Sequence, residues 1–453
     1  MLLHTFCRWQ NCFLIRCHIS IFVHSVHRAA HLLFDHYVRF VQPSLYHLFV
    51  TLYCQIDAPS KVIDSRKYGL LFSAMSHPPP SPSHILRGHI AQVNALWFSD
   101  DNERLYSGDA AGAIVITSTR TLRPLAAWNA HTDGILGVQE LEDRVITSTR
   151  QGQQAAPAPG LQTPTLCYSM DVNALNYCRF SLLALSETAR TDECRALIAL
   201  PNLVDSSVAD VWTLPSMQRL HAAIGKTGQR PSSPNERNAL GIIMSMHLFE
   251  AAHPHIVGQI QLRLLCGYEN GSVSMWAYTR RDKETSVEGI GWDSLWSVKL
   301  HVETIMAMTV SRDNSFALTV SADHLVGRYD IQAAGNQAAV QIACTVHRTK
   351  HPGNGSIAIR DDGKVCAIGG WDGKIRLYST KTMKSLGTLD YHKKSCQVLA
   401  FARSEQHSMA ARDDTDSDDE MGSEEKAERC RWLASGSQDH RVAIWTLINF
   451  GKT

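Results

Sequence analysis

The chain has 453 residues, 44% of them hydrophobic, and its 44 Lys and Arg against 43 Asp and Glu leave a formal net charge of +1. Because this balance indicates neither a polyanion-binding nor a bilayer surface, we expect protein partners, no direct nucleic acid and no membrane. The 12 Cys residues include no Cys-x-x-Cys pair, which argues against a zinc site or a disulfide framework. We therefore expect no cofactor, and reduced thiols in an intracellular compartment.

Residues 1–74 show no repeat and hold seven of the 22 His residues. Arg8, Arg16 and Arg28, with no acid in the first 34 residues, would suit a targeting segment, but the richness in His and Cys argues against one. The longest uncharged run, residues 41–56, contains Pro43 and is shorter than the about 18 residues of a membrane span. We interpret residues 1–74 as a disordered or non-native extension, followed by a proline-rich linker at 75–82.

A strand-and-turn pattern recurs from residue 83 onward. In "AIGGWDGKIRLYS", residues 367–379, an Asp-Gly turn leads into alternating polar and apolar residues, which predicts a strand leaving a tight hairpin. An Asp or Asn precedes an aromatic residue by six positions in four copies: Asn270 with Trp276, Asp323 with Tyr329, Asp372 with Tyr378, and Asp439 with Trp445. A fifth copy keeps the frame but has Ala111 and Thr117 at the two positions.

A His residue precedes the first strand in several copies, and the repeated pattern resembles the WD-repeat family. In that family, repeats of about 40–45 residues each form a four-stranded propeller blade. Seven blade starts can be counted: His89, His131, near Tyr177, near Ile242, His301, His347 or His351, and His392. We therefore predict an all-β fold, a seven-bladed WD-repeat β-propeller over residues 83–448, with a non-propeller N-terminal extension.

Two segments interrupt the predicted propeller. Residues 145–170 lack the turn Asp and aromatic of the second blade and read as an irregular, linker-like insertion rich in Ala, Pro, Gly and Gln. Residues 404–428 include an acidic run from Asp413 to Glu428 that we expect to be a solvated loop in the last blade. The alternative for this loop is a docking site for a basic partner, or a phosphorylation site at Ser417.

The WD resemblance implies which residues are structural and which bind partners. A blade holds its turn Asp in a buried network with His, Ser or Thr and Trp, and an unpaired group there would cost about 1–3 kcal/mol. The predicted structural network comprises His89, Ser107, His301, Asp323, Asp372, His392, Asp439 and Trp445. The position before the turn Asp often contacts partners, which selects Glu269, Trp371 and Gln438 as candidate partner-binding residues. Trp371 could instead pack on the neighbouring blade.

The blocks "LRGHIAQVNALWFSDDNERLYSGDAAG", "LPNLVDSSVADVWTLPSMQRLHAAIG" and "IGGWDGKIRLYSTKTMKSLGTLDYHKKSC" narrow the resemblance. They resemble the fungal ASTRA-associated WD-repeat family, which is similar to the animal G-protein-β-subunit-like proteins. The family implies a non-enzymatic scaffold subunit of the nuclear ASTRA complex, linked to chromatin remodelling and to assembly of PI3K-like kinases. Its implied partners are ASTRA complex subunits and a PI3K-like kinase.

Two other functions remain open for a propeller. The first is a substrate-recruiting receptor of a ubiquitin ligase, which would use the same fold. The second is a propeller hydrolase, but the sequence contains no Ser/His/Asp set, glycine-rich phosphate loop or HExxH helix. We therefore expect that the chain is not an enzyme, although fold alone does not decide function.

Overall fold

The computed structural model describes residues 80–149, 164–173, 175–226, 240–253, 256, 258–332, 344–404 and 423–448. The predicted extension at 1–74 lies outside these residues. Within them, the strands are β1 (His84–Leu86), β2 (Val93–Phe98), β3 (Arg104–Asp109), β4 (Ala113–Ser118), β5 (Pro124–Asn129), β6 (Ile135–Leu141), β7 (Arg144–Thr149), β8 (Ser181–Ala184), β9 (Cys194–Pro201), β10 (Ala209–Pro215), β11 (Arg219–Ile224), β12 (Ile243–Ala252), β13 (Ile260–Tyr268), β14 (Ser272–Tyr278), β15 (Trp292–Lys299), β16 (Ile305–Val310), β17 (Phe316–Ser321), β18 (Leu325–Asp330), β19 (Cys344–Arg348), β20 (Asn354–Ile359), β21 (Val365–Gly370), β22 (Lys374–Ser379), β23 (Ser385–Asp390), β24 (Cys396–Phe401), β25 (Trp432–Ser437) and β26 (Val442–Thr446).

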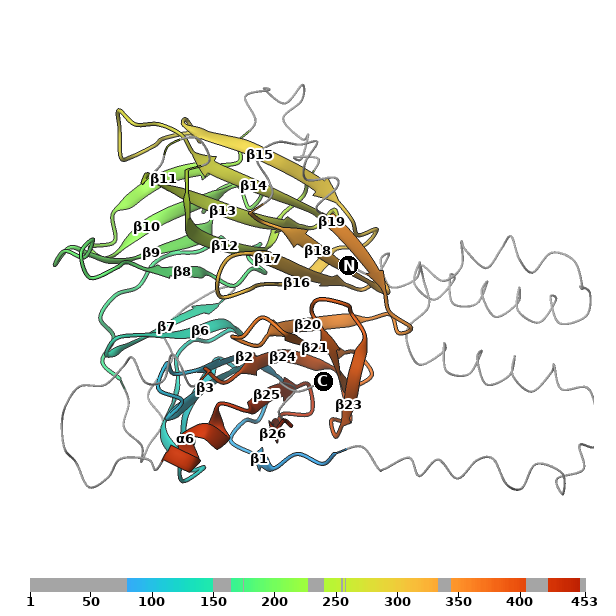
Figure 1. Ribbon diagram of the computed structural model, residues 1–453. Coiled ribbons are helices and arrows are strands. Elements are labelled where there is room, and N and C mark those ends of the chain that lie inside the picture. The colour runs from blue at the N-terminus through green and yellow to red at the C-terminus, as the bar shows by residue number, and fades with distance from the viewer. Residues whose placement is uncertain are drawn as a thin grey trace, which may run out of the picture. The chain divides into compact units, whose positions relative to one another are not determined.

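These strands form six four-stranded antiparallel sheets and one two-stranded sheet (Figure 1). Five of the blades use consecutive strands: β2–β5, β8–β11, β12–β15, β16–β19 and β20–β23. The sixth blade has the order β1-β26-β25-β24, so it joins the first described strand to the last three. Figure 1 shows the blue β1 beside the red β26. The ring is therefore closed by pairing both ends of the propeller in one sheet, which covers an edge that would otherwise be open.

The prediction of seven blades is wrong, because the described residues form a propeller of six four-stranded blades. After His131, where the second blade was expected, the described residues form only the two-stranded sheet β6-β7. β7 ends at Thr149, and no strand is described between residues 164 and 180. The residues that follow Thr149 in the sequence include Pro157 and Pro159, and they lack the Asp and aromatic of a blade turn. Proline cannot donate to a strand ladder, so this composition disfavours further strands of a blade.

Most of the acidic segment predicted as a loop, residues 405–422, lies outside the described residues, but its end differs from the prediction. Ser423–Arg429 form a short helix, α6, with Glu424 and Glu425 in its first turn and Arg429 in its last. Arg429 Nη2 lies 2.6 Å from Glu425 Oε1, one helical turn earlier. These charges suit the helix dipole and an (i, i+4) pair, which explains a helix where only an acidic run was considered.

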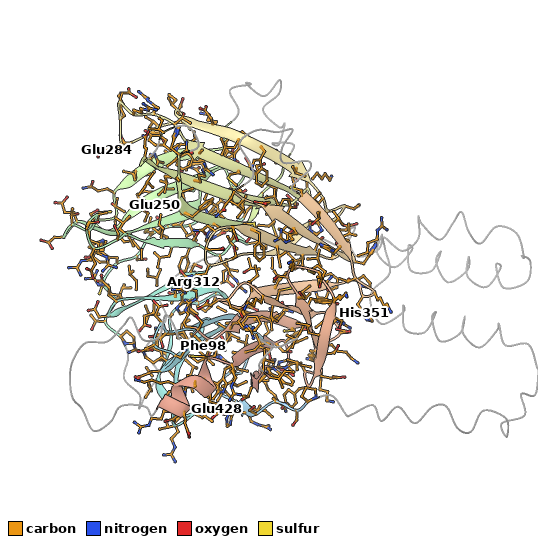
Figure 2. All side chains as sticks on the ribbon, viewed as in Figure 1. Phe98, Glu250, Glu284, Arg312, His351 and Glu428 are labelled. Atoms are coloured by element: carbon orange, nitrogen blue, oxygen red, sulfur yellow. The ribbon has the colours of Figure 1, made fainter. Side chains whose placement is uncertain are left out.

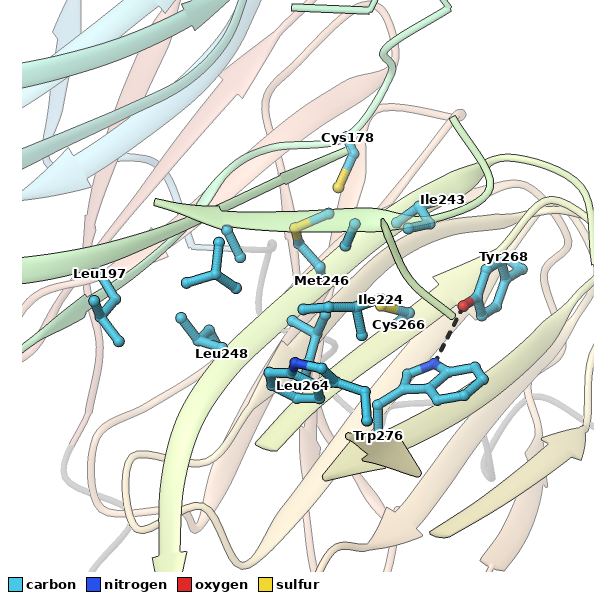
Figure 3. Packing of buried hydrophobic residues seen from close by; sticks show 14 residues of the cluster. Cys178, Leu197, Ile224, Ile243, Met246, Leu248, Leu264, Cys266, Tyr268 and Trp276 are labelled. Atoms are coloured by element: carbon cyan, nitrogen blue, oxygen red, sulfur yellow. Dashed lines mark hydrogen bonds between the residues drawn. The ribbon is translucent and has the colours of Figure 1, made fainter. Parts of the chain in front are cut away.

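Apolar clusters between neighbouring sheets make the core. β17, β21 and β25 are buried along their whole length, because each is the second strand of its blade and packs between two other blades. Figure 3 shows the cluster between the β8–β11 and β12–β15 blades, where Leu264 and Ile224 are buried together. In the same cluster, Trp276 Nε1–H donates to Tyr268 Oη over 3.4 Å, so the indole N–H is paired within the core.

Glycines at the turns between the second and third strands fix how neighbouring sheets meet. Gly112, Gly271 and Gly373 all have a positive φ, of 86°, 87° and 79°. A Cβ at each would collide with the carbonyl oxygen of the His that precedes the next sheet, which is His131, His301 or His392 respectively. Only glycine allows both this conformation and this approach. We call the end of the blades where these turns lie the turn face.

Candidate functional site

A hydrogen-bonded network joins the strands of the last blade at the turn face. His392 Nδ1 lies 3.0 Å from Asp439 Oδ2, and His392 Nε2 lies 2.9 Å from Ser435 Oγ. Trp445 Nε1–H donates to the same Ser435 Oγ over 2.9 Å. Because a carboxylate only accepts, Nδ1 carries the proton of the imidazole in the His392–Asp439 pair. The network links the loop before β24, the strand β25, the β25–β26 turn and the strand β26.

The β16–β19 blade has the same arrangement. His301 Nδ1 lies 3.0 Å from Asp323 Oδ2, and its Nε2 lies 2.8 Å from Thr319 Oγ1. The Leu325 N–H donates to Asp323 Oδ1 over 2.9 Å, which holds the turn that leads into β18. The predicted residues His301 and Asp323 are thus in direct contact, with Thr319 as the hydroxyl partner.

The β2–β5 blade contains an acid that the sequence interpretation missed. His89 Nε2 lies 2.7 Å from Ser107 Oγ, and His89 Nδ1 lies 2.9 Å from Asp109 Oδ2. Asp109 Oδ1 also accepts from the N–H groups of Ala111 and Ala113. Asp109 stands two residues before Ala111, the position that the repeat alignment assigned to the acid. The signal was present as an Asp directly after Ser107-Gly108, but the fixed spacing concealed it.

Two sheets depart from the His–Asp arrangement. Beside β6, His131 Nε2 lies 2.8 Å from Thr147 Oγ1, and among the described residues His131 donates no hydrogen bond to a carboxylate. In the β20–β23 blade, Asp372 pairs with Arg376 at 2.5 Å and accepts from the Lys374 N–H, and its side chain is 43% exposed. The predicted structural residue Asp372 therefore holds its turn through an arginine.

The β8–β11 blade uses another acid that was not predicted. In the sequence, Ser206 stands where the third predicted blade would have its turn Asp. In the structure, Asp210 at the start of β10 accepts from Asn202 Nδ2 at 2.9 Å and from the Ala223 N–H at 2.8 Å. Asp210 is buried and joins the β9–β10 turn to β11. No fixed spacing from a His marks it in the sequence.

Burial and hydrogen bonding act in opposite directions on the blade carboxyls. Burial alone would raise the pKa of Asp109, Asp323 and Asp439, but the bonds from their His partners and from backbone N–H groups lower the pKa of all three. Burial also lowers the pKa of His392, despite the opposing charge of Asp439. At neutral pH the last blade therefore pairs a carboxylate with a neutral imidazole, as a structural network requires.

The three candidate partner-binding residues are exposed, and two of them belong to turns that contact the same loop, residues 392–395. The side chain of Trp371 belongs to a residue that is 49% exposed, and the backbone N–H of Trp371 donates to Gly353 O over 2.8 Å. The Trp371 turn packs through Gly373 on the backbone of residues 392–394, while the Gln438 N–H donates to Ser395 O in the same loop. Glu269 lies apart, in the β13–β14 turn, where it accepts from the Ile242 N–H over 3.3 Å.

The indole of Trp371 lies over glycines of its own blade. A Cβ at Gly353 would come within 2.9 Å of the ring, and one at Gly355 within 3.1 Å. The ring therefore rests on the start of β20, which belongs to its own blade.

Among the described residues, no three His, Cys, Asp or Glu side chains gather as metal ligands would. That part of the chain also holds no helix long and apolar enough to cross a membrane.

Four-stranded blades in a ring, closed by β1 and held by His–Ser/Thr–Asp networks, define a WD-repeat β-propeller. A family model described as "WD domain, G-beta repeat" matches residues 80–116 and 344–379. ASTRA-associated protein 1 of Verticillium alfalfae is 31% identical over 404 residues, covering 82% of this chain and 93% of the relative. The Schizosaccharomyces pombe ASTRA-associated protein 1 is 26% identical over 361 residues, covering 71% of this chain and 93% of the relative.

A mouse protein named guanine nucleotide-binding protein subunit beta-like protein 1 is 25% identical over 383 residues, covering 83% of this chain and 98% of that protein. The likeness thus extends through the propeller in both fungal and animal relatives. The chain belongs to the ASTRA-associated protein 1 family.

Proposed function

We propose that the chain is a non-enzymatic scaffold subunit of an ASTRA complex in the nucleus, where it takes part in chromatin remodelling and in the assembly of PI3K-like kinases. The observation that carries the proposal is the extent of the family likeness. It covers 82% of this chain and 93% of the Verticillium relative, whose name records association with ASTRA. The proposed partners are ASTRA complex subunits and a PI3K-like kinase, without direct nucleic-acid or membrane binding.

The chemistry of the turn face supports binding over catalysis. The His and Asp side chains that could act as acids and bases are held against one another inside blades, as in the His392–Asp439 pair at 3.0 Å. By contrast, Trp371 exposes about half of its surface. A buried and fully paired His–Asp set stabilises a blade, whereas an exposed Trp on a rigid turn is a typical binding anchor.

The test is an affinity purification from Schizosaccharomyces pombe cells that lack their own relative and express the tagged full chain. Partners in the nuclear extract are identified by mass spectrometry. We expect the large kinase-like ASTRA subunit and its companions to be enriched over a tag-only control. Enrichment of a cullin adaptor in their place would instead favour the ubiquitin-ligase receptor, and absence of ASTRA subunits from a folded, nuclear bait would contradict the proposal.

A further inference from the structure

Trp371 lies in a part of the turn face that is rich in lysine. Lys393 and Lys394 are exposed in the loop that packs against the Trp371 turn, and Lys350 is exposed in the segment that leads from β19 to Gly353. Figure 2 shows His351, which follows Lys350, at the end of the blades away from Glu250 and Glu284. We call Trp371, Lys350, Lys393 and Lys394 the lysine–tryptophan patch.

The acids near this patch are already bound by other side chains, Asp372 and Asp390 in ion pairs and Asp439 in a hydrogen bond with His392. Asp372 lies 2.5 Å from Arg376, Asp390 lies 3.0 Å from Lys374, and Asp439 lies 3.0 Å from His392. In contrast, Lys350, Lys393 and Lys394 form no ion pair within the part of the chain that the structure describes. Their positive charges are therefore available to an incoming anionic group.

The pKa of His351, which follows Lys350, is shifted by the charged groups around the patch. Burial lowers the pKa of His351, and the nearby charge of Arg376 lowers it further, followed by those of Lys350 and Lys374. Asp372 acts in the opposite direction but does not reverse the shift. Three of the four charges that act on His351, those of Arg376, Lys350 and Lys374, are positive, and only that of Asp372 is negative.

Trp371 gives this positive surface an apolar anchor. The ring rests on the glycines at the start of β20, so one face is supported by backbone while about half of the residue faces solvent. An aromatic ring that is already immobilised loses little conformational entropy on binding. A ligand that suits this surface combines carboxylates for the lysines with an apolar side chain for the ring.

We propose that the lysine–tryptophan patch binds an acidic, extended segment of a partner protein, with an apolar side chain on Trp371 and carboxylates at Lys350, Lys393 and Lys394. The proposal rests on the scaffold function, because it states the chemistry by which one partner is held. Charge complementarity between the three exposed lysines and carboxylates is the argument for this occupant.

The test measures binding of a short fluorescein-labelled peptide, rich in glutamate with one central leucine, to the purified full chain by fluorescence anisotropy. The control peptide has glutamine in place of every glutamate. We expect the acidic peptide alone to bind, and its affinity to fall with added salt, because the contacts are ionic. The Lys393→Glu/Lys394→Glu variant should bind it about tenfold more weakly.

The matched control is Lys381→Glu/Lys384→Glu, which makes the same charge change at exposed lysines in the turn between β22 and β23. It should leave peptide affinity unchanged, while Trp371→Ala should weaken it. Equal binding of the acidic and glutamine peptides, or equal loss in both double variants, would overturn the proposal. Tighter binding of a single-stranded DNA oligonucleotide of the same charge, lost with Lys393→Glu/Lys394→Glu, would overturn it in favour of a nucleic-acid site.

The two proposals fail in different ways. If the Lys393→Glu/Lys394→Glu variant captured ASTRA subunits as well as the original chain and the acidic peptide did not bind, the patch proposal would be overturned and the scaffold function would stand. If the peptide bound as expected but no ASTRA subunit were captured, the scaffold function would fail while the chemistry of the patch remained.

Discussion

At the scale of single residues, three of the four-stranded blades hold a His through a carboxylate, but not from one fixed position. Asp323 and Asp439 occupy the turn, whereas Asp109 lies two residues earlier, at the end of β3. In all three, the carboxylate meets His Nδ1 at 2.9–3.0 Å. The geometry of the pair is therefore kept while its position in the sequence is not.

If the acid can hold the His from either position, one substitution should lower stability and a second should restore part of it. Asp109→Ala should lower the free energy of unfolding by about 1–3 kcal/mol, because His89 and two backbone N–H groups lose their acceptor. Adding Ala111→Asp to that variant should recover part of the loss by restoring the acid at the usual turn position. Urea unfolding of both variants checks this, and a double variant no more stable than Asp109→Ala would refute the equivalence of the two positions.

A second residue-scale prediction concerns His221 in β11. It is 2% exposed, its ring centroid lies 4.5 Å from that of Tyr278, and burial lowers its pKa to about 4. An unfolded His has a pKa of about 6.5. Between these values the unfolded chain binds a proton that the folded chain does not, so the free energy of unfolding should fall as the pH drops from about 6.5 to 4, by up to about 3 kcal/mol.

Urea titrations at several pH values measure this dependence, with His221→Gln as the comparison. The variant should lose much of the change between pH 6.5 and 4. It should keep the further loss below about pH 4, where Asp109, Asp323 and Asp439 take up protons through their lowered pKa values. An unchanged slope in His221→Gln would assign the effect to other groups.

At the scale of elements, the turn glycines predict how neighbouring blades are joined. Gly373→Ala should destabilise the protein by more than about 2 kcal/mol, because alanine at a φ of 79° is strained and its Cβ would meet the carbonyl of His392. The control is Gly258→Ala, which has a φ of 80° but nothing within 4 Å of the added Cβ. Equal losses of stability in thermal unfolding would mean that the contact with the next blade contributes nothing.

The sequence located strands better than it counted blades. A strand follows each predicted start, because apolar alternation and Asp-Gly or Asn-Gly turns are local signals. Whether a sheet reaches four strands depends on later residues, and those described between 164 and 180 form no strand. Asp210 could not be predicted, since its partners Asn202 and Ala223 meet it only after β9, β10 and β11 pair.

The candidate site, like the fold, was predicted from the sequence only in part. The exposure of Trp371, Gln438 and Glu269 agrees with their position before a turn, although their part in partner binding stays a prediction. The lysines around Trp371 come from the segment before β20 and the loop before β24. The packing of Gly373 on the loop at 392–394 and of Trp371 on Gly353 brings these lysines to one surface, so no motif in the sequence could predict the patch.

At the scale of the whole molecule, closure of the ring depends on β1. His84, Ile85 and Leu86 pair with β26, and Ser83 Oγ–H donates to Thr446 Oγ1 over 2.9 Å. Removing residues 1–74 should therefore leave the melting temperature unchanged, since every one of these contacts remains. Removing residues 1–87 takes away β1 but keeps His89, and should lower the melting temperature by several degrees. A similar loss in both truncations, measured by calorimetry, would contradict an independent fold over residues 75–453.

The central claim, that this propeller is an ASTRA scaffold that uses its turn face, is tested most directly by quantitative affinity purification. The original chain is compared with Trp371→Ala and with Leu125→Ala, which removes an apolar side chain that is 50% exposed on β5. All three should unfold with similar free energies. We predict that ASTRA subunits are recovered with the original chain and Leu125→Ala, and about tenfold less with Trp371→Ala. Recovery of ASTRA subunits at equal levels with all three would contradict the use of this face, and recovery with none would contradict the scaffold itself.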